Sequence, residues 1–380
     1  MMHICFVTDE YPKEGFPHGG IGSFVKTIAK ELVQRGVRVS VVGINYTQNR
    51  EYESADDIHV FRLPRRHLKG FAWWANARTI NKTIAEIHRQ NPITVVETAE
   101  LGLAFLNKIK GVKYVIRTHG GHHFFSEAEN RGIDPWKGFQ EKRSFAKADA
   151  FITVSEYVKT HTAKYLSYKG KPVETINYPV NIDLFRPISK AAVDKSIVFA
   201  GTVCEKKGVR QLVQAFEHVK EAFPAATLHI YGRDWFFPDG SSYVKMLQDR
   251  ELPALGPAAA SIFFHGPISH LHLPEKYAEA HVCAFPSHME TQGLVVPEAM
   301  LMKKAVVFSA LGPGPETIVD GQTGLLCNPH SPEDIAQKIQ WVFDNPDEVD
   351  AMAERARTSA LTKYSPDRIV GLNLAFYKSL

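Results

Sequence analysis

Short apolar runs alternate along the chain with longer segments in which apolar residues recur every three or four positions. The first run, over residues 4–8, predicts a strand, and the segment from Ile21 to Val33 predicts a helix with one apolar face. Gly36 is expected to end this helix, because glycine readily takes the left-handed conformation that closes a helix. Further strands are predicted over residues 37–43, 58–63, 94–97, 114–117 and 150–154. Strands separated by helices are typical of a parallel sheet with helices on its faces.

The alternation is interrupted near the middle of the chain and then begins again. A proline-rich segment over residues 177–187 leads into a polar link that ends at Lys195. Beyond it, strands are predicted over residues 197–200, 227–231, 261–265 and 281–285, and a helix over residues 209–222. Because 380 residues exceed what one compact domain usually holds, we predict an α/β protein of two Rossmann-like domains, residues 1–188 and 189–364, that face each other across a cleft.

The composition fits a soluble globular enzyme, with 44% hydrophobic and 23% charged residues. No apolar run approaches the ~18 residues of a membrane span, and the four cysteines show no C-x-x-C or metal-site spacing. We therefore expect a cytoplasmic protein with reduced, mostly buried thiols. The net charge of +4 hides an asymmetry: residues 1–190 hold 28 Lys and Arg against 19 Asp and Glu, and the rest hold 17 against 22. A basic first half suits an anionic surface or acceptor, and neutral drift explains it equally well.

One stretch of the second half combines a helix start with two carboxylates. A helix is predicted to open near Gly293 and Leu294, and the free N–H groups of these residues and of Val295 suit an oxyanion or a phosphate. Glu290 lies just before this helix, and Glu298 lies one turn beyond Leu294. Two carboxylates that hold hydroxyls on either side of an anion would fit a sugar–diphosphate–ribose. The alternative is an ordinary strand–loop–helix with two surface glutamates.

The same stretch resembles the signature of the retaining glycosyltransferases of family 4, which have the double-Rossmann GT-B fold. The resemblance rests on Glu290 and Glu298 with seven residues between them, on Gly-Leu-Val inside this interval and on Glu-Ala-Met at its end. It implies that Glu290 binds hydroxyls of the donor sugar, that Glu298 binds the ribose, and that the N–H groups hold the diphosphate. Gln292 departs from the family pattern, which usually has Phe or another large apolar residue there.

A second loop, from Gly201 to Gly208, resembles the family's Gly-Arg…Lys-Gly loop. The resemblance implies that Lys207 clamps the donor diphosphate, whereas Thr202 stands where the family usually has Arg. Stabilisation of the leaving group would then rely more on Lys207 and the helix start. The nucleotide base is expected against the loop Gly266-Pro267-Ile268, which follows a predicted strand at the carboxyl edge of the second sheet.

The first half supplies fewer candidates, and each rests on the resemblance. The loop with Gly19 and Gly20 lacks G-x-G-x-x-G, and it resembles the family opening in which a Gly-Gly loop approaches donor phosphates and acceptor. His119 follows a strand in a Thr-His-Gly segment that resembles the one whose histidine contacts the donor sugar. His122 and His123 are candidate acceptor contacts. The three histidines form no recognisable metal-ligand set, and we expect no metal.

Two further segments carry expectations of their own. Residues 65–74, Arg-Arg-His-Leu-Lys-Gly-Phe-Ala-Trp-Trp, mix cations with aromatic rings. Such a stretch suits an anionic membrane or a glycan acceptor, and the alternative is a basic loop before a helix whose Trp residues pack in the core. The C-terminal helix, residues 365–380, is expected to cross back onto the first domain, as the resemblance implies.

These observations predict a retaining, metal-independent glycosyltransferase without a cofactor. The donor would be a nucleotide-diphosphate hexose, with UDP favoured over GDP, and the acceptor a hydroxyl of a glycan, a lipid-linked or a small molecule. His119 and Glu290 would orient the sugar while Lys207 stabilises the leaving diphosphate. We expect no nucleic-acid partner, and peripheral contact with the inner face of a membrane stays open. The alternatives are a nucleotide-sugar-binding protein without turnover and an NAD-dependent oxidoreductase, for which neither half supplies G-x-G-x-x-G.

Overall fold

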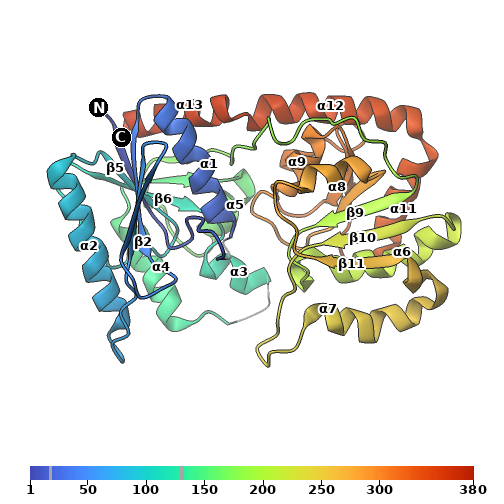
Figure 1. Cartoon of the computed structure of the whole chain (residues 1–380), viewed down its shortest axis with the longest axis horizontal. Helices are drawn as coiled ribbons and strands as arrows, with labels where there is room; N and C mark the ends of the chain where they lie inside the picture. Colours follow the sequence, from blue (N-terminus) through green and yellow to red (C-terminus); the bar gives the residue numbers. More distant parts are fainter. Residues whose placement is uncertain (17–18, 129–131) are drawn as a thin grey trace. The chain divides into compact units, whose positions relative to one another are not determined.

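The chain forms two compact units in a computed structural model that describes residues 1–16, 19–128 and 132–380 (Figure 1). Unit 1 consists of Met1–Pro179 and Pro366–Leu380, and unit 2 of Val180–Ser365. The division comes nine residues before the predicted boundary at residue 188. The reason is that Val180 and Phe185 are buried in the hydrophobic core of unit 2, so the proline-rich segment packs with the second sheet.

Unit 1 is built on an eight-stranded sheet in the order β3-β4-β2-β1-β5-β6-β7-β8. The strands are β1 (His3–Val7), β2 (Arg38–Ile44), β3 (Glu51–Ala55), β4 (Ile58–Leu63), β5 (Val95–Thr98), β6 (Lys113–Thr118), β7 (Ala150–Thr153) and β8 (Val173–Thr175). Only the β3–β4 pair is antiparallel. Since β1 lies between β2 and β5, the strand order reverses at the carboxyl end of β1, where open α/β sheets bind ligands.

The helices of unit 1 include the last one of the chain. They are α1 (Gly20–Gln34), α2 (Ala72–Gln90), α3 (His122–Ala128), α4 (Pro135–Lys147), α5 (Glu156–Ala163) and α13 (Pro366–Ser379). As predicted, Gly36 follows α1 with a φ of 74°. Arg117 of β6 is buried, pairs with Glu97 of β5 at 2.7 Å and donates hydrogen bonds to Asn373 and Tyr377 of α13. This buried network fixes α13 to the first sheet and confirms the expected return of the C-terminal helix.

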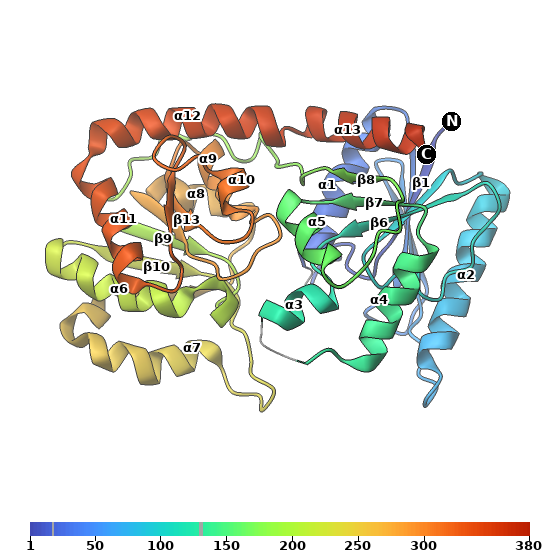
Figure 2. The ribbon, with the colours of Figure 1, turned by 180° about the vertical axis from the view of Figure 1, so that it is seen from behind.

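Unit 2 is built on a six-stranded parallel sheet in the order β11-β10-β9-β12-β13-β14. The strands are β9 (Ser196–Ala200), β10 (Thr227–Tyr231), β11 (Ile262–Gly266), β12 (Val282–Phe285), β13 (Ala305–Ser309) and β14 (Leu325–Cys327). The helices are η1 (Glu205–Lys207), α6 (Val209–Ala222), α7 (Tyr243–Met246), η2 (Leu247–Glu251), η3 (Leu252–Ser261), α8 (Leu273–Glu279), α9 (Val295–Leu301), α10 (Gly314–Thr317), α11 (Pro332–Asp344) and α12 (Pro346–Tyr364). Helix α6 packs against α11, and α9 packs against α12 (Figure 2).

The expectations about the cysteines and about a membrane span can be compared with the structure. All four cysteines, Cys5, Cys204, Cys283 and Cys327, are buried free thiols. Among the described helices, none is both long enough and apolar enough to cross a bilayer. The two Rossmann-like sheets confirm the predicted α/β fold class.

Candidate functional site

Two loops touch at the carboxyl edge of the second sheet, and a glycine allows the contact. One loop follows β9 and contains η1, and the other follows β12. Gly208 has a φ of 67°, and a Cβ atom at this position would lie 1.8 Å from the carbonyl oxygen of Pro286. The N–H of His288 donates to the carbonyl of Lys206 at 2.9 Å. Only glycine permits this approach, which places the loop after β9 directly beside the loop after β12.

The contact brings together the lysine predicted to clamp the diphosphate and one of the two carboxylates predicted to flank it. Lys207 Nζ forms an ion pair with Glu290 Oε1, and Ser287 Oγ donates to the same oxygen at 3.3 Å. The side chains of Lys207 and Glu290 are 24% and 11% exposed, so both still reach solvent. The catalytic roles assigned to them from the sequence stay predictions.

The start of α9 presents backbone donors next to this ion pair. Gly293 has a φ of 74°, which favours glycine, and Leu294 precedes the first helical residue, Val295. Among the residues that the structure describes, none accepts a hydrogen bond from the N–H groups of these three residues. Pro297 falls in the first turn, where the missing N–H has no intrahelical partner to lose. The side chain of Gln292 is buried.

Glu298 is held inside unit 2 by two aromatic side chains. Its Oε1 is bonded to His270 Nε2 at 2.8 Å, and its Oε2 accepts from Tyr277 Oη at 3.5 Å. Burial lowers the pKa of His270, but the hydrogen bond and the negative charge of Glu298 outweigh burial and raise that pKa. The sequence did not single out His270, although it lies two residues beyond Ile268 in the loop predicted to hold the base.

A hollow lies beside that loop. Its volume is about 280 Å³, and its walls include Gly266 and Pro267 together with Val203 and Gly232. Gly266 has a φ of 74° at the end of β11, and Ile268 packs against the core of unit 2. The position of a nucleotide base at this loop stays a prediction. The hollow is the space that a base would occupy there.

Thr202 has a cationic neighbour that the sequence did not reveal. Arg233 Nε donates to Thr202 Oγ1 at 3.3 Å. Arg233 follows β10, which pairs in parallel with β9, and its carbonyl accepts from the N–H of Val203 at 2.9 Å. Parallel pairing therefore places a guanidinium next to the position where the family loop usually has its arginine. The sequence pattern that could have indicated this contact is Tyr-Gly-Arg at the end of a strand. It points to Thr202 only when the pairing of β10 with β9 is known.

In unit 1 the glycine loop packs on Glu10, three residues beyond the end of β1. The N–H of Gly19 donates to Glu10 Oε2 at 3.1 Å, and Gly20 begins α1. A Cβ atom on Gly22 would lie 2.0 Å from the carbonyl oxygen of Glu10. The loop is thus fixed at the carboxyl end of β1, where the order of strands reverses.

His119 follows β6 with its ring against two aromatic side chains that also contact each other. The ring centroids of Phe24 and Tyr178 lie 5.7 and 5.6 Å from that of His119, and Nδ1 bonds to Tyr178 Oη. Burial, and then the charge of Arg117, hold the pKa of His119 far below its usual range. The imidazole is therefore neutral at physiological pH. Tyr178 is, after His270 and Arg233, a third residue that sequence reasoning missed.

The other two histidines shape the loop that follows. Glu141 of α4 accepts from the N–H groups of His122 and His123 and contacts Nδ1 of His123. His122 Nε2 accepts from the N–H of Asp134 at 2.8 Å. His123 is buried while His122 is partly exposed, and an acceptor contact for either stays a prediction. In the described part of the chain, no cluster of three or more His, Cys, Asp or Glu side chains could hold a metal ion.

A second buried carboxyl lies beneath the same loop. Glu100 follows β5, and its carboxyl lies near the N–H groups of His119 and Gly120. A Cβ atom on Gly121 would lie 2.1 Å from Glu141 Oε1 and 2.9 Å from Glu100 Cγ, so the loop is enclosed by both glutamates. Burial, assisted by the charge of Glu141, raises the pKa of Glu100 to about 8.

Comparison with known proteins connects both units to one family. The model of the glycosyl transferases group 1 matches residues 181–359, and that of Glycosyltransferase Family 4 matches residues 18–184. An uncharacterized glycosyltransferase of Methanocaldococcus jannaschii is 26% identical over 398 residues, which cover 99% of this chain and 98% of the relative.

Solved structures support the fold. Sucrose-phosphate synthase from Thermosynechococcus elongatus matches with a TM-score of 0.85 at 20% identity, over 100% of this chain and 99% of that one. Anabaena HepE in complex with UDP and glucose matches with a TM-score of 0.77 at 18% identity, over 100% of both chains. Two adjoining family models and a full-length relative thus agree with the two Rossmann-like sheets: the chain belongs to the family 4 type of glycosyltransferase, with the GT-B fold.

Proposed function

We propose that this glycosyltransferase moves a hexose-type sugar from UDP to a hydroxyl of a glycan, lipid-linked or small-molecule acceptor, with retention of configuration and without a metal ion. The observation that carries the proposal is the cluster formed by Lys207, Glu290 and the free N–H groups that begin α9. The fold match to HepE in complex with UDP and glucose supports the choice of donor.

In this proposal the donor diphosphate takes over the partners of Glu290. Its oxygens accept from the N–H groups of Gly293 and Leu294 and pair with Lys207. Glu290, released from Lys207, then accepts from hydroxyls of the donor sugar. Glu298 accepts from the ribose hydroxyls in a position already fixed by His270. The base lies against Gly266, Pro267 and Ile268.

The chemical step needs stabilisation of the leaving group more than a base. The bond between the anomeric carbon and the diphosphate oxygen breaks with its electron pair on the diphosphate. The acceptor oxygen bonds to the same face of the anomeric carbon, and its proton passes to the departing phosphate. Lys207 and the N–H groups of α9 stabilise the growing negative charge. Neutral His119 contributes a hydrogen bond that orients the sugar.

Arg233 extends this proposal to the position that Thr202 leaves without a cation. The guanidinium already bonds to the Thr202 hydroxyl, and a rotation of this exposed side chain would let it pair with a diphosphate oxygen. We propose that Arg233 and Lys207 together form the cationic clamp.

The test is release of nucleotide diphosphate from a panel of nucleotide sugars, including UDP-glucose, UDP-N-acetylglucosamine and GDP-mannose, with and without EDTA. Slow transfer to water reports donor choice without a known acceptor, and NMR of the sugar released gives its anomeric configuration. We expect release of UDP, undiminished by EDTA, with the α-anomer first from an α-linked donor. Preferential release of GDP would overturn the choice of UDP, and loss of activity in EDTA would overturn the absence of a metal ion. Release of the inverted anomer would overturn retention of configuration.

A further inference from the structure

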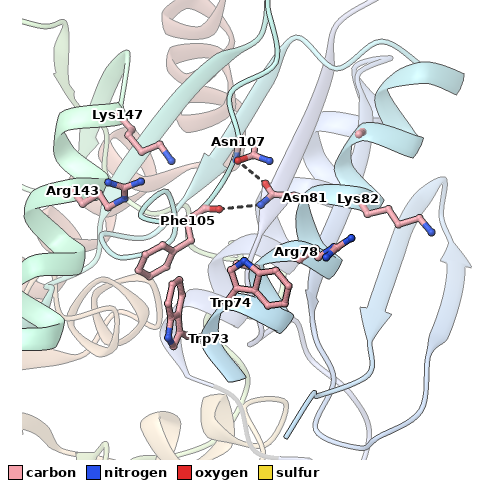
Figure 3. A pocket seen from close by; sticks show the side chains of 11 residues that line it. Trp73, Trp74, Arg78, Asn81, Lys82, Phe105, Asn107, Arg143 and Lys147 are labelled. Atoms are coloured by element: carbon pink, nitrogen blue, oxygen red, sulfur yellow. Dashed lines mark hydrogen bonds between the residues drawn. The ribbon is translucent and has the colours of Figure 1, made fainter. Parts of the chain in front are cut away.

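A hollow of about 460 Å³ lies in unit 1 between α2, α4 and the loop at residues 105–107 (Figure 3). Trp73, Trp74 and Phe105 provide its aromatic walls. The two Trp residues are 38% and 46% exposed, so the alternative that they pack in the core is wrong. The buried residues of α2 lie in its later turns, at Ile84 and Ile87, because only that part of the helix covers the sheet.

The aromatic side chains form a continuous surface that joins two helices. The ring of Trp73 lies 4.4 Å from that of Phe105 and 5.5 Å from that of Trp136 on α4. Asn81 of α2 donates to the carbonyl of Phe105 at 2.9 Å and accepts from the N–H of Asn107 at 2.7 Å (Figure 3). These bonds fix the loop to α2, so the hollow is pre-formed.

Four cations line the same hollow: Arg78 and Lys82 on α2, and Arg143 and Lys147 on α4. Arg143 Nε donates to the carbonyl of Ala104 at 2.7 Å, and Lys147 Nζ donates to that of Leu106. Within the described ranges, no carboxylate lies within 4.0 Å of the charged nitrogens of Arg78, Arg143 or Lys147.

Lys82 pairs with Glu86 at 3.8 Å, so three of the four cations have no carboxylate partner among the described residues. Burial, and then the charges of Arg143 and Lys108, lower the pKa of Lys147. Cations that crowd one another without a carboxylate are stabilised by an anionic ligand. Aromatic walls beside them favour a ligand that also has an apolar face.

The hollow has a neighbour that reaches the place where the strand order reverses. A second hollow of about 200 Å³ shares Trp73, Ala77 and Phe105 with the first and extends to Asp9 and Gly102. Asp9 follows β1 and Gly102 follows β5, and both strand ends lie at the carboxyl edge of the sheet. The two hollows are therefore neighbours that share these three residues as walls, one at the sheet edge and the other at the cations.

We propose that these two neighbouring hollows bind an oligosaccharide acceptor that carries anionic residues. Sugar rings pack their C–H faces on Trp73, Trp74 and Phe105, and carboxylate, sulfate or phosphate groups on the sugar pair with Arg78 and Arg143. The end that carries the reacting hydroxyl lies toward Asp9. The inference rests on the proposed function, because it takes the ligand to be the acceptor of sugar transfer.

A membrane surface suits this region less well than a glycan. Arg143 and Lys147 are held by backbone carbonyls of the loop, and Lys147 is partly buried, so a flat lipid surface would mainly meet the rims of the hollow. A chain of anionic sugar residues can enter the hollow and reach these two side chains.

The test is calorimetric titration of the full-length protein with two anionic probes, a tetragalacturonate and a sulfated tetrasaccharide, and with neutral maltotetraose. We expect at least one anionic probe to bind at least tenfold more tightly than maltotetraose. The double variant Arg78→Gln/Arg143→Gln should weaken that binding about tenfold or more, the scale of hydrogen bonds to charged groups. Its matched control, Arg89→Gln/Lys142→Gln, removes the same charge from exposed positions of the same helices and should bind as wild type.

Trp74→Leu serves as a second variant, because this exposed side chain can be replaced without touching a carbonyl contact. It should weaken binding of the anionic probe about three- to tenfold, which lies within the range for an aromatic stacking contact. Equal binding of neutral and anionic probes, no binding of either anionic probe, or equal effects of the two double variants would overturn the inference. Binding to phosphatidylglycerol vesicles in place of the saccharides, lost in Arg78→Gln/Arg143→Gln alone, would overturn it in favour of a membrane. Release of UDP from UDP-sugars is measured separately, so failure of this inference is distinguishable from failure of the proposed function.

Discussion

The candidate donor site of unit 2 and the hollow of unit 1 hold their charged side chains in opposite ways. In unit 2, Lys207 pairs with Glu290 and His270 pairs with Glu298, so the candidate donor site is internally balanced. In unit 1, the cations Arg143 and Lys147 contact backbone carbonyls, and their charge is not offset. A ligand in unit 2 must exchange partners within existing pairs, whereas an anion in the hollow meets free positive charge. We therefore expect binding in the hollow to depend more strongly on salt than binding of UDP.

The largest expected effect is at Glu290. Glu290→Ala should lower kcat for sugar release from UDP-glucose by about 10²–10⁴-fold, the range for positioned catalytic groups, because the sugar loses its carboxylate partner. UDP affinity, measured by calorimetry, should barely change, since Lys207 stays in place. His119→Ala should give the same contrast between kcat and affinity.

Glu275→Ala is the control for Glu290, since it removes an exposed carboxylate from α8 and should leave both quantities unchanged. Loss of UDP binding together with kcat in Glu290→Ala would place this residue on the diphosphate. An unchanged rate in His119→Ala would make this histidine a structural residue of the first sheet.

The effect of Glu100 on the pH dependence of stability tests the burial of its carboxyl in unit 1. Its pKa is about 8 in the folded protein against an ordinary 4.5, so between these values the folded state keeps a proton that the unfolded state has released. Its contribution to stability therefore falls as pH rises. The free energy of unfolding of Glu100→Gln, relative to wild type, should rise by about 1.4 kcal/mol per pH unit in this window. Urea denaturation at pH 5, 6.5 and 8 measures it, with exposed Glu174→Gln as a control that should show no trend.

Glu298→Ala tests the balanced site directly. It should cost about 1.5–3 kcal/mol of UDP binding, the scale of a hydrogen bond to a charged group, because the ribose loses its acceptor. Tyr277→Phe, which removes only the long contact to the carboxylate, should cost much less. Equal UDP affinity in Glu298→Ala and wild type would refute the assignment of the ribose to this residue.

Arg233 is expected to give the smallest effect. Arg233→Gln should weaken UDP binding by about 1 kcal/mol or less, because the side chain is exposed and its charge is screened. The control is Arg250→Gln, an exposed arginine of unit 2 outside the site. If the two variants bind UDP equally well, Lys207 is the main cation of the clamp.

Most of the fold could be predicted from the sequence because apolar periodicity marks buried elements. The predicted bounds of β4, α6 and β10 agree with the structure. Strand β3 was missed because four of its five residues are exposed and largely polar, and β8 because it has only three residues. Both lie at edges of the sheet, where one side of the strand has no neighbour that demands a hydrophobic pattern.

The site was predictable only where its residues are close in sequence. Glu290 and Glu298 could be read from one stretch, whereas His270 and Arg233 matter because folding places them beside Glu298 and Thr202. No local pattern encodes that neighbourhood. The exposure of Trp73 could not be predicted either, because it depends on which turns of α2 pack against the rest of unit 1. The buried residues of α2 all lie in its later turns.

The network around Arg117 has a consequence for the order in which the protein can be made. Unit 2 is one continuous stretch, so it is able to complete its core as soon as residue 365 has emerged from the ribosome. Unit 1 begins first but lacks Asn373 and Tyr377 until residues 366–379 have been added. Until then Arg117 has Glu97 as its charge partner but not the polar groups of α13. The half of the chain that is synthesised first therefore reaches its final state last.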